Sequence, residues 1–173
     1  MTYAIVYDSR TGNTERLARA LAEELPEQGR LAYGSLDEVD VSAVSQADRV
    51  YAGFWTNRGD CTDEMAEMLA GLAGKEVFLF GTAGFGADET YFAGVAARVA
   101  VHVPESARIV GSFMCQGRMP RSVRDRYERT AEQNPAQAAR MKQLIENFDE
   151  AADHPNDDDL ALLRAKVRSV PLG

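Results

Sequence analysis

A short polar loop near the N-terminus has the composition of a phosphate-binding site. It reads Ser9, Arg10, Thr11, Gly12, Asn13 and Thr14, and so supplies three hydroxyls, an amide side chain and a glycine that lets the backbone approach a ligand. The loop lies between a predicted strand and a predicted helix, where free amides favour an anion. It matches neither G-x-x-x-x-G-K-[ST] nor G-x-G-x-x-G. An ordinary turn with a threonine N-cap is the alternative interpretation.

Two later loops carry aromatic and glycine residues that suit a planar ligand. The first contains Trp55, Thr56, Asn57, Arg58 and Gly59, and the second, at residues 82–87, contains Thr82, Ala83, Gly84, Phe85 and Gly86, with Tyr91 downstream. Trp55, the single tryptophan, offers a flat face to a ring, and Gly59 lets a peptide change orientation. The alternatives are that Phe54 and Trp55 only plug the core, that Arg58 faces solvent, and that Asp88 only caps the next helix.

The elements that must position these loops alternate between strands and helices. Strands are predicted at residues 3–7, 30–33, 49–53, 77–80 and 109–114, and helices at 17–25, 63–72, 88–101, 122–133, 136–148 and from 156 onward. Residues 35–47 are left unassigned. Such alternation predicts a five-stranded parallel sheet in a doubly wound, three-layer α/β sandwich. In that fold the loops after the strands meet at one edge of the sheet, where ligands bind.

Composition excludes several classes of protein. The 173 residues predict a single domain over 1–173, and 27 acidic against 19 basic residues give a net charge of −8. This charge argues against binding to nucleic acid or to an anionic membrane surface. We find no signal peptide and no apolar run near the roughly 18 residues of a membrane span, so we expect a cytoplasmic protein.

The segment from Tyr3 to Leu25 resembles the start of a flavodoxin. The flavodoxin phosphate loop reads [ST]-x-T-G-x-T, and Ser9, Thr11, Gly12 and Thr14 match its fixed positions. The resemblance implies that this loop holds the phosphate of flavin mononucleotide (FMN), and that the loops at 55–59 and 82–86, with Tyr91, surround the flavin ring. It also implies an electron-transfer function, with the redox chemistry supplied by the cofactor.

The segment at 116–155 is longer than flavodoxins usually have between the fifth strand and the last helix. It predicts a helical elaboration that begins at the flavin edge of the sheet. Residues 53–55, 80–84, 111–120 and 145–149 resemble a bacterial subfamily, the flavodoxins that accompany bilirubin-reducing enzymes. That resemblance implies electron delivery to a transient partner, a reductase. The alternative is an FMN-dependent reductase of a quinone, porphyrin or tetrapyrrole. A phosphoacceptor receiver is disfavoured because Asp8 lacks neighbouring acids.

Three remaining features leave alternatives open. Cys61 and Cys115 are either redox-active thiols or small buried hydrophobes, and no metal site is predicted. A basic cluster either binds an acidic partner or a substrate carboxylate, or is a solvated helix face balanced by acids; it comprises Arg118, Arg121, Arg124 and Arg126. The net charge of −8 also predicts a low flavin potential, because nearby acids disfavour the negative charge of the reduced ring.

Overall fold

The strands of this computed structural model form one fully parallel sheet. The structure describes residues 1–86 and 88–173, and Ala87 of the predicted loop at 82–87 lies outside them. The strand order is β2-β1-β3-β4-β5, which confirms the predicted doubly wound topology. The strands are β1 (Tyr3–Tyr7), β2 (Arg30–Ser35), β3 (Arg49–Trp55), β4 (Glu76–Ala83) and β5 (Arg108–Gln116).

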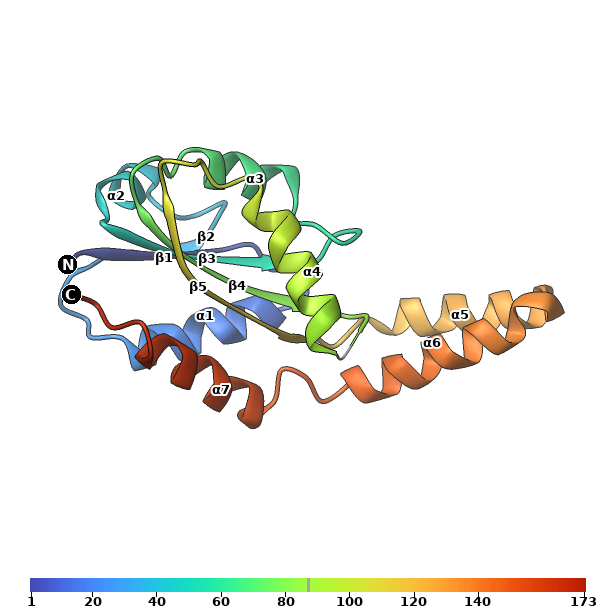
Figure 1. Cartoon of the computed structure of the whole chain (residues 1–173). Helices are drawn as coiled ribbons and strands as arrows, with labels where there is room; N and C mark the ends of the chain where they lie inside the picture. The colour runs from blue at the N-terminus through green and yellow to red at the C-terminus, as the bar shows by residue number, and fades with distance from the viewer. Residues whose placement is uncertain (87) are drawn as a thin grey trace.

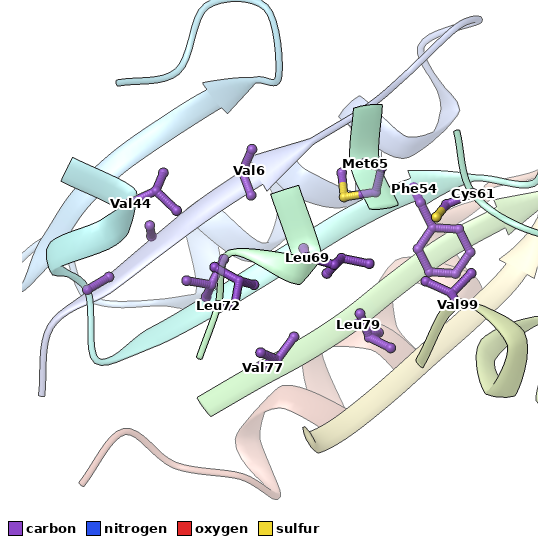
Figure 2. Close-up of a cluster of buried hydrophobic side chains, with 14 of the residues drawn as sticks. Val6, Val44, Phe54, Cys61, Met65, Leu69, Leu72, Val77, Leu79 and Val99 are labelled. Carbon is purple, nitrogen blue, oxygen red and sulfur yellow. The ribbon is translucent and has the colours of Figure 1, made fainter. Parts of the chain in front are cut away.

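Helices cover both faces of the sheet and complete the predicted three layers (Figure 1). They are α1 (Asn13–Glu24), α2 (Val41–Gln46), α3 (Asp63–Ala70), α4 (Glu89–Ala100), α5 (Arg121–Gln133), the short 3₁₀ helix η1 (Pro135–Gln137), α6 (Ala138–Ala151) and α7 (Asp157–Arg168). Helices α1 and α7 pack on one face through residues such as Leu17, Leu21 and Leu163. Helices α2, α3 and α4 pack on the other face, whose buried cluster is shown in Figure 2.

Four strands, β2, β3, β4 and β5, extend two or three residues further at their C-terminal ends than the sequence predicts. Glycines near their ends look like turn residues, but Gly53 pairs with Phe80, and Phe54 pairs with Gly81, across β3 and β4. A Cβ atom on Gly53 would lie 2.3 Å from the Phe80 ring, and one on Gly81 would lie 2.6 Å from the Phe54 ring. These glycines therefore stay in the sheet because they make room for the opposing rings.

Residues 35–47, for which the sequence pattern predicts no element, contain α2. The Asp40 side chain caps this helix by accepting hydrogen bonds from the backbone N–H groups of Ser42 and Ala43, at 2.9 and 3.3 Å. The final helix begins as expected. Asn156 and Asp159 form a reciprocal capping box there, and the acidic first turn suits the positive end of the helix dipole.

The elaboration after β5 is a helical hairpin that projects from the body of the protein. In Figure 1, α5 and α6 run side by side beyond the edge of the sheet where the strands end, and both termini lie at the opposite end. Within the described residues, α5 has no buried residue, and α6 buries only Met141 and Ala151. The Asn147 amide ties the base of the hairpin to the body, because it donates to the Gly84 carbonyl oxygen at 2.9 Å and accepts from Gln116 at 3.2 Å.

Candidate functional site

A cavity of about 920 Å³ lies at the edge of the sheet where the strands end, between the loops and the base of the hairpin. Twelve predicted site residues line it: Arg10, Thr11, Asn13, Trp55, Thr56, Arg58, Gly59, Thr82, Ala83, Gly84, Phe85 and Tyr91. Five others do not line it: Ser9, Gly12, Thr14, Asn57 and Gly86. The structure therefore brings the three predicted loops together, as the parallel topology requires.

The first loop presents the N-terminus of α1 to this edge. Gly12 is the N-cap residue, with φ of 82°, and a Cβ atom there would meet no atom within 4 Å. The first intrahelical bond runs from the Arg16 N–H to the Gly12 carbonyl oxygen, at 3.0 Å. The amides of Asn13 and Thr14 precede that bond, and open space lies in front of Gly12. This is the geometry of an anion site at a helix start.

The Thr14 side chain points away from the cavity. It is fully buried, and its hydroxyl lies 3.2 Å from the Phe54 carbonyl oxygen and 3.1 Å from the Thr82 hydroxyl. It therefore joins α1 to β3 and β4, and only its backbone amide faces the helix terminus. The alternative interpretation of this loop, a turn with a threonine N-cap, is wrong, because the N-cap residue is Gly12, which has no side chain to cap the helix. The Ser9 hydroxyl instead accepts from the Glu15 N–H at 3.2 Å.

The loop after β3 is a tight turn closed by Asn57 and Asp60, whose backbones exchange hydrogen bonds of 2.7 and 3.0 Å. Its central residues, Arg58 and Gly59, both have positive φ, at 52° and 87°, as in a type I′ turn. The Arg98 side chain, from α4, donates to the Gly59 carbonyl oxygen at 2.6 Å. The Gly59 carbonyl is thus held by α4 rather than presented to the cavity.

The two aromatic residues at the end of β3 have different roles. Phe54 is 1% exposed and plugs the core, as one of the alternatives in the sequence predicts for both residues. Trp55 is instead partly exposed and lines the cavity. The Arg10 guanidinium lies over the Trp55 ring, 5.5 Å from its centroid. Beside it, the Thr56 hydroxyl is buried and, within the described residues, has no hydrogen-bond partner. Such a group is a ready contact for a polar ligand edge.

The loop after β4 adds a second aromatic wall. Phe85 is 52% exposed and meets Tyr91 edge to face, with ring centroids 5.7 Å apart. The Gly86 backbone lies against the Tyr91 ring, since a Cβ atom there would be 2.4 Å from it. Asp88 caps α4 by accepting a hydrogen bond from the Tyr91 N–H at 2.7 Å, which confirms the interpretation of Asp88 as a helix cap.

The fourth wall of the cavity was not predicted as part of the site. It consists of the segment after β5 and one face of α5: Gly117, Arg118, Met119, Pro120, Ser122, Val123, Arg126, Tyr127 and Arg129. The Asn13 amide fixes it to the first loop, because it donates to the Arg118 carbonyl oxygen at 2.8 Å. The arginine spacing is visible in the sequence, but the direction in which the hairpin projects is not.

The two cysteines are buried, and both are small hydrophobic residues of the core. Cys61 packs near Phe54 and Met65 (Figure 2), and Cys115 belongs to the cluster on the other face. Burial, with the nearby Asp60 carboxylate, raises the pKa of the Cys61 thiol to about 12, and burial also raises the pKa of the Cys115 thiol. Both thiols therefore stay protonated at neutral pH, which disfavours redox activity.

Cys61 also lies next to a small polar cluster. Asp60, Cys61 and His102 each place one potential ligand atom within 4.8 Å of the others. Burial acts to raise the pKa of Asp60, but the Cys61 N–H and His102 lower it by more, and the net direction is down. The protonated Cys61 thiol is a poor metal ligand, so the cluster is better described as a hydrogen-bonded pair of Asp60 and His102, with the His102 Nε2 atom 3.2 Å from the carboxylate.

The fold and this cavity define a class of protein, and comparisons with known proteins agree. Residues 4–168 match the flavodoxin domain, so the chain belongs to this family and not to the receivers. It is 39% identical to the flavodoxin-like domain-containing protein BilS of Clostridium symbiosum (strain WAL-14163), over 99% of this chain and 97% of that protein. It is 26% identical to BilS of Clostridioides difficile (strain CD3), over 92% and 90%.

A solved structure supports the same fold. The flavodoxin of Streptococcus pneumoniae TIGR4 superposes with a TM-score of 0.52 at 24% identity, and the match covers 87% of this chain and 99% of that one. No helix among the described residues is long and apolar enough to cross a membrane.

FMN is the cofactor of this family of electron-transfer proteins, and the residues present fit it. The helix terminus at Gly12 has open space for a phosphate, and the buried Thr56 hydroxyl, which has no partner among the described residues, is available to a polar ring edge. Trp55 and Tyr91 provide aromatic surface. The volume of about 920 Å³ is within the usual range for ligand pockets, about 300–1,000 Å³.

Proposed function

We propose that this chain binds FMN in the cavity and delivers electrons to a partner reductase in the cytoplasm. The observation that carries the proposal is the convergence of the three loops and the α1 terminus on one cavity. The flavin supplies the redox chemistry when bound. The protein holds the cofactor and limits the access of water and of other molecules to the ring.

The residues divide between the two ends of the cofactor. The backbone amides at Gly12, Asn13 and Thr14, with the Thr11 hydroxyl, hold the phosphate. Ser9 and Asn13 shape the loop through their hydrogen bonds to Glu15, Thr11 and Arg118.

The ring end of the cofactor meets the other two loops. Trp55 and Tyr91 flank the ring, and Phe85 covers its outer part. The Thr56 hydroxyl and the backbone from Thr82 to Gly86 hydrogen-bond to its polar edge. The turn at Asn57, Arg58 and Gly59 closes the remaining side.

Flavin retention tests this proposal. The purified protein is incubated with FMN, desalted, and examined by visible absorption, and we expect it to keep the bands of a bound flavin. Thr11→Glu places a negative charge at the phosphate position and should abolish retention. Ser106→Glu, in an exposed loop at the opposite end of the sheet, should keep it. A folded wild-type protein without flavin, or equal retention by Thr11→Glu, would contradict the proposal.

A second candidate function is that of an FMN-dependent reductase of a small molecule. The observation that favours it is the fourth wall of the cavity, formed by the segment after β5 and one face of α5. It gives the cavity a side that the three predicted loops do not provide. Turnover of a small acceptor with NAD(P)H, without any partner protein, would distinguish this reductase from the electron carrier.

A further inference from the structure

The cavity is strongly cationic although the protein is acidic. Five arginines line it: Arg10, Arg58, Arg118, Arg126 and Arg129. All five are exposed, and among the described residues no aspartate or glutamate lines the cavity with them. None of the five forms an ion pair within the part of the chain that the structure describes. The remaining surface must therefore carry a charge more negative than the total of −8.

Bound FMN neutralises only part of this charge. A phosphate monoester carries about −1.5 to −2 at neutral pH, so about three of the five positive charges remain. Positive side chains that gather in a concave site with few acids raise the local concentration of anions. The cavity thus has charge for a second anion in addition to the phosphate of the cofactor.

The arginines of α5 fall into two groups, which lie on different faces of the helix. Arg121 pairs with Asp125 at 3.0 Å, and Arg124 pairs with Glu128 and Asp149, so the acids of the hairpin neutralise these two. Arg126 and Arg129, three residues apart and on one side of α5, line the cavity and pair with no acid among the residues that the structure describes. The interpretation as a helix face balanced by acids therefore holds for Arg121 and Arg124, but it does not hold for the arginines that line the cavity.

Aromatic groups accompany Arg126 and Arg129. The Arg126 guanidinium lies 5.6 Å from the centre of the Tyr127 ring, and Tyr127 also lines the cavity. Phe85 is exposed on the loop after β4 and lines the same cavity. A concave site with aromatic surface and a few convergent charges is typical of small-molecule binding, in contrast to the flatter contact between two proteins.

We propose that Arg126 and Arg129 form a second anion subsite, which binds a small aromatic dianion beside the flavin. Its ligand carries carboxylate, sulfonate or phosphate groups that the guanidinium forks hold in bidentate pairs. The subsite selects anionic acceptors or donors for electron exchange with the cofactor. This inference rests on the proposed flavin site for the neighbouring ring, but the arginines belong to the protein alone.

Calorimetric titration of the oxidised, FMN-loaded protein with anthraquinone-2,6-disulfonate tests the subsite without electron transfer. We expect saturable binding that weakens as salt is added. Arg126→Gln/Arg129→Gln should weaken it by about tenfold or more, because two charge-assisted contacts are lost. The matched control, Arg121→Gln/Arg140→Gln, removes the same charge from the hairpin outside the cavity and should change the affinity less than about twofold.

Parallel titrations identify the source of the anion. NAD⁺ offers phosphates and benzene-1,4-dicarboxylate offers carboxylates, and the one that displaces the disulfonate at lower concentration identifies the class of the natural ligand. Absent binding to the wild-type protein, or equal weakening in both double variants, would overturn the subsite. Tighter binding of a hexaglutamate peptide than of the disulfonate would assign the arginines to an acidic protein segment instead. Flavin absorption, recorded before each titration, reports the proposed function separately.

Discussion

Gly117 lies where the segment after β5 packs against the first loop. It is buried, and a Cβ atom there would lie 2.7 Å from the Asn13 side-chain nitrogen and 3.2 Å from the Thr82 Cβ atom. Asn13 hydrogen-bonds in turn to the Thr11 hydroxyl at 3.0 Å. The shape of the phosphate loop therefore depends on the absence of a side chain at position 117.

Gly117→Ala should weaken FMN binding by about tenfold, equivalent to about 1.4 kcal/mol, because the new methyl group displaces Asn13. The dissociation constant can be measured by titrating the apo-protein with FMN. Gly94→Ala is the matched control: a Cβ atom there meets nothing within 4 Å, and the position is inside α4. That change should leave the affinity unaltered and stabilise the fold by up to about 1 kcal/mol. Equal FMN affinities for the two variants would refute the proposed role of Gly117.

Arg49 ties together several elements at the end of the sheet opposite the cavity. It is 3% exposed, pairs with Glu76 of β4, and donates to the Val170 carbonyl oxygen at 2.7 Å. Glu76 also pairs with Arg108 at the start of β5. Three neighbouring strands and the C-terminal segment thus share one charged network, and the loss of one partner would leave a buried charge unpaired.

Glu76→Gln should lower the free energy of unfolding by about 3 kcal/mol at pH 7. Burial acts to raise the pKa of Glu76, but Arg49 and Arg108 lower it by more, so it lies below the unfolded-state value. The carboxylate therefore stabilises the fold above the unfolded-state pKa of about 4.3, and this contribution is lost as the pH falls through the folded-state pKa.

Urea unfolding of the wild type and Glu76→Gln at a series of pH values measures this difference, which should shrink below about pH 4. Glu105→Gln, at an exposed position before β5, should change little at any pH. A difference that stays constant down to the acid limit would show that the ion pair is not its cause.

The elements also show what the sequence could and could not reveal. The apolar run at residues 3–7 and the capped acidic start of α7 are local signals, and both predict the observed elements. The predicted strands around Gly53 and Gly81 are too short, because both glycines look like turn residues. Their role is set by aromatic rings on the neighbouring strand. The fourth wall of the cavity, which includes one face of α5, was not predicted for a similar reason. The amphipathic pattern predicts a helix but not where the helix lies relative to the loops.

At the scale of the whole molecule, the distribution of charge is more informative than its total. The net charge of −8 predicts a low flavin potential, yet the cavity that would surround the flavin is lined by five arginines. Electrostatic interactions weaken with distance, and exposed charges beyond about 8 Å are largely screened at physiological salt. The arginines in the cavity should therefore influence the reduced flavin more than the distant acids do.

We expect Arg58→Gln and Arg118→Gln each to lower the two-electron midpoint potential of the bound flavin. Each removes a positive charge that favours the additional negative charge of the reduced ring, and a loss of about 1 kcal/mol corresponds to about 20 mV for two electrons. Glu27→Gln and Glu105→Gln change the net charge by the same amount in the opposite sense, but they lie at the other end of the sheet and should leave the potential within about 5 mV. Anaerobic titration against a reference dye measures all four variants. If the acid variants shifted the potential as much as the arginine variants, total charge rather than the cavity lining would control the flavin.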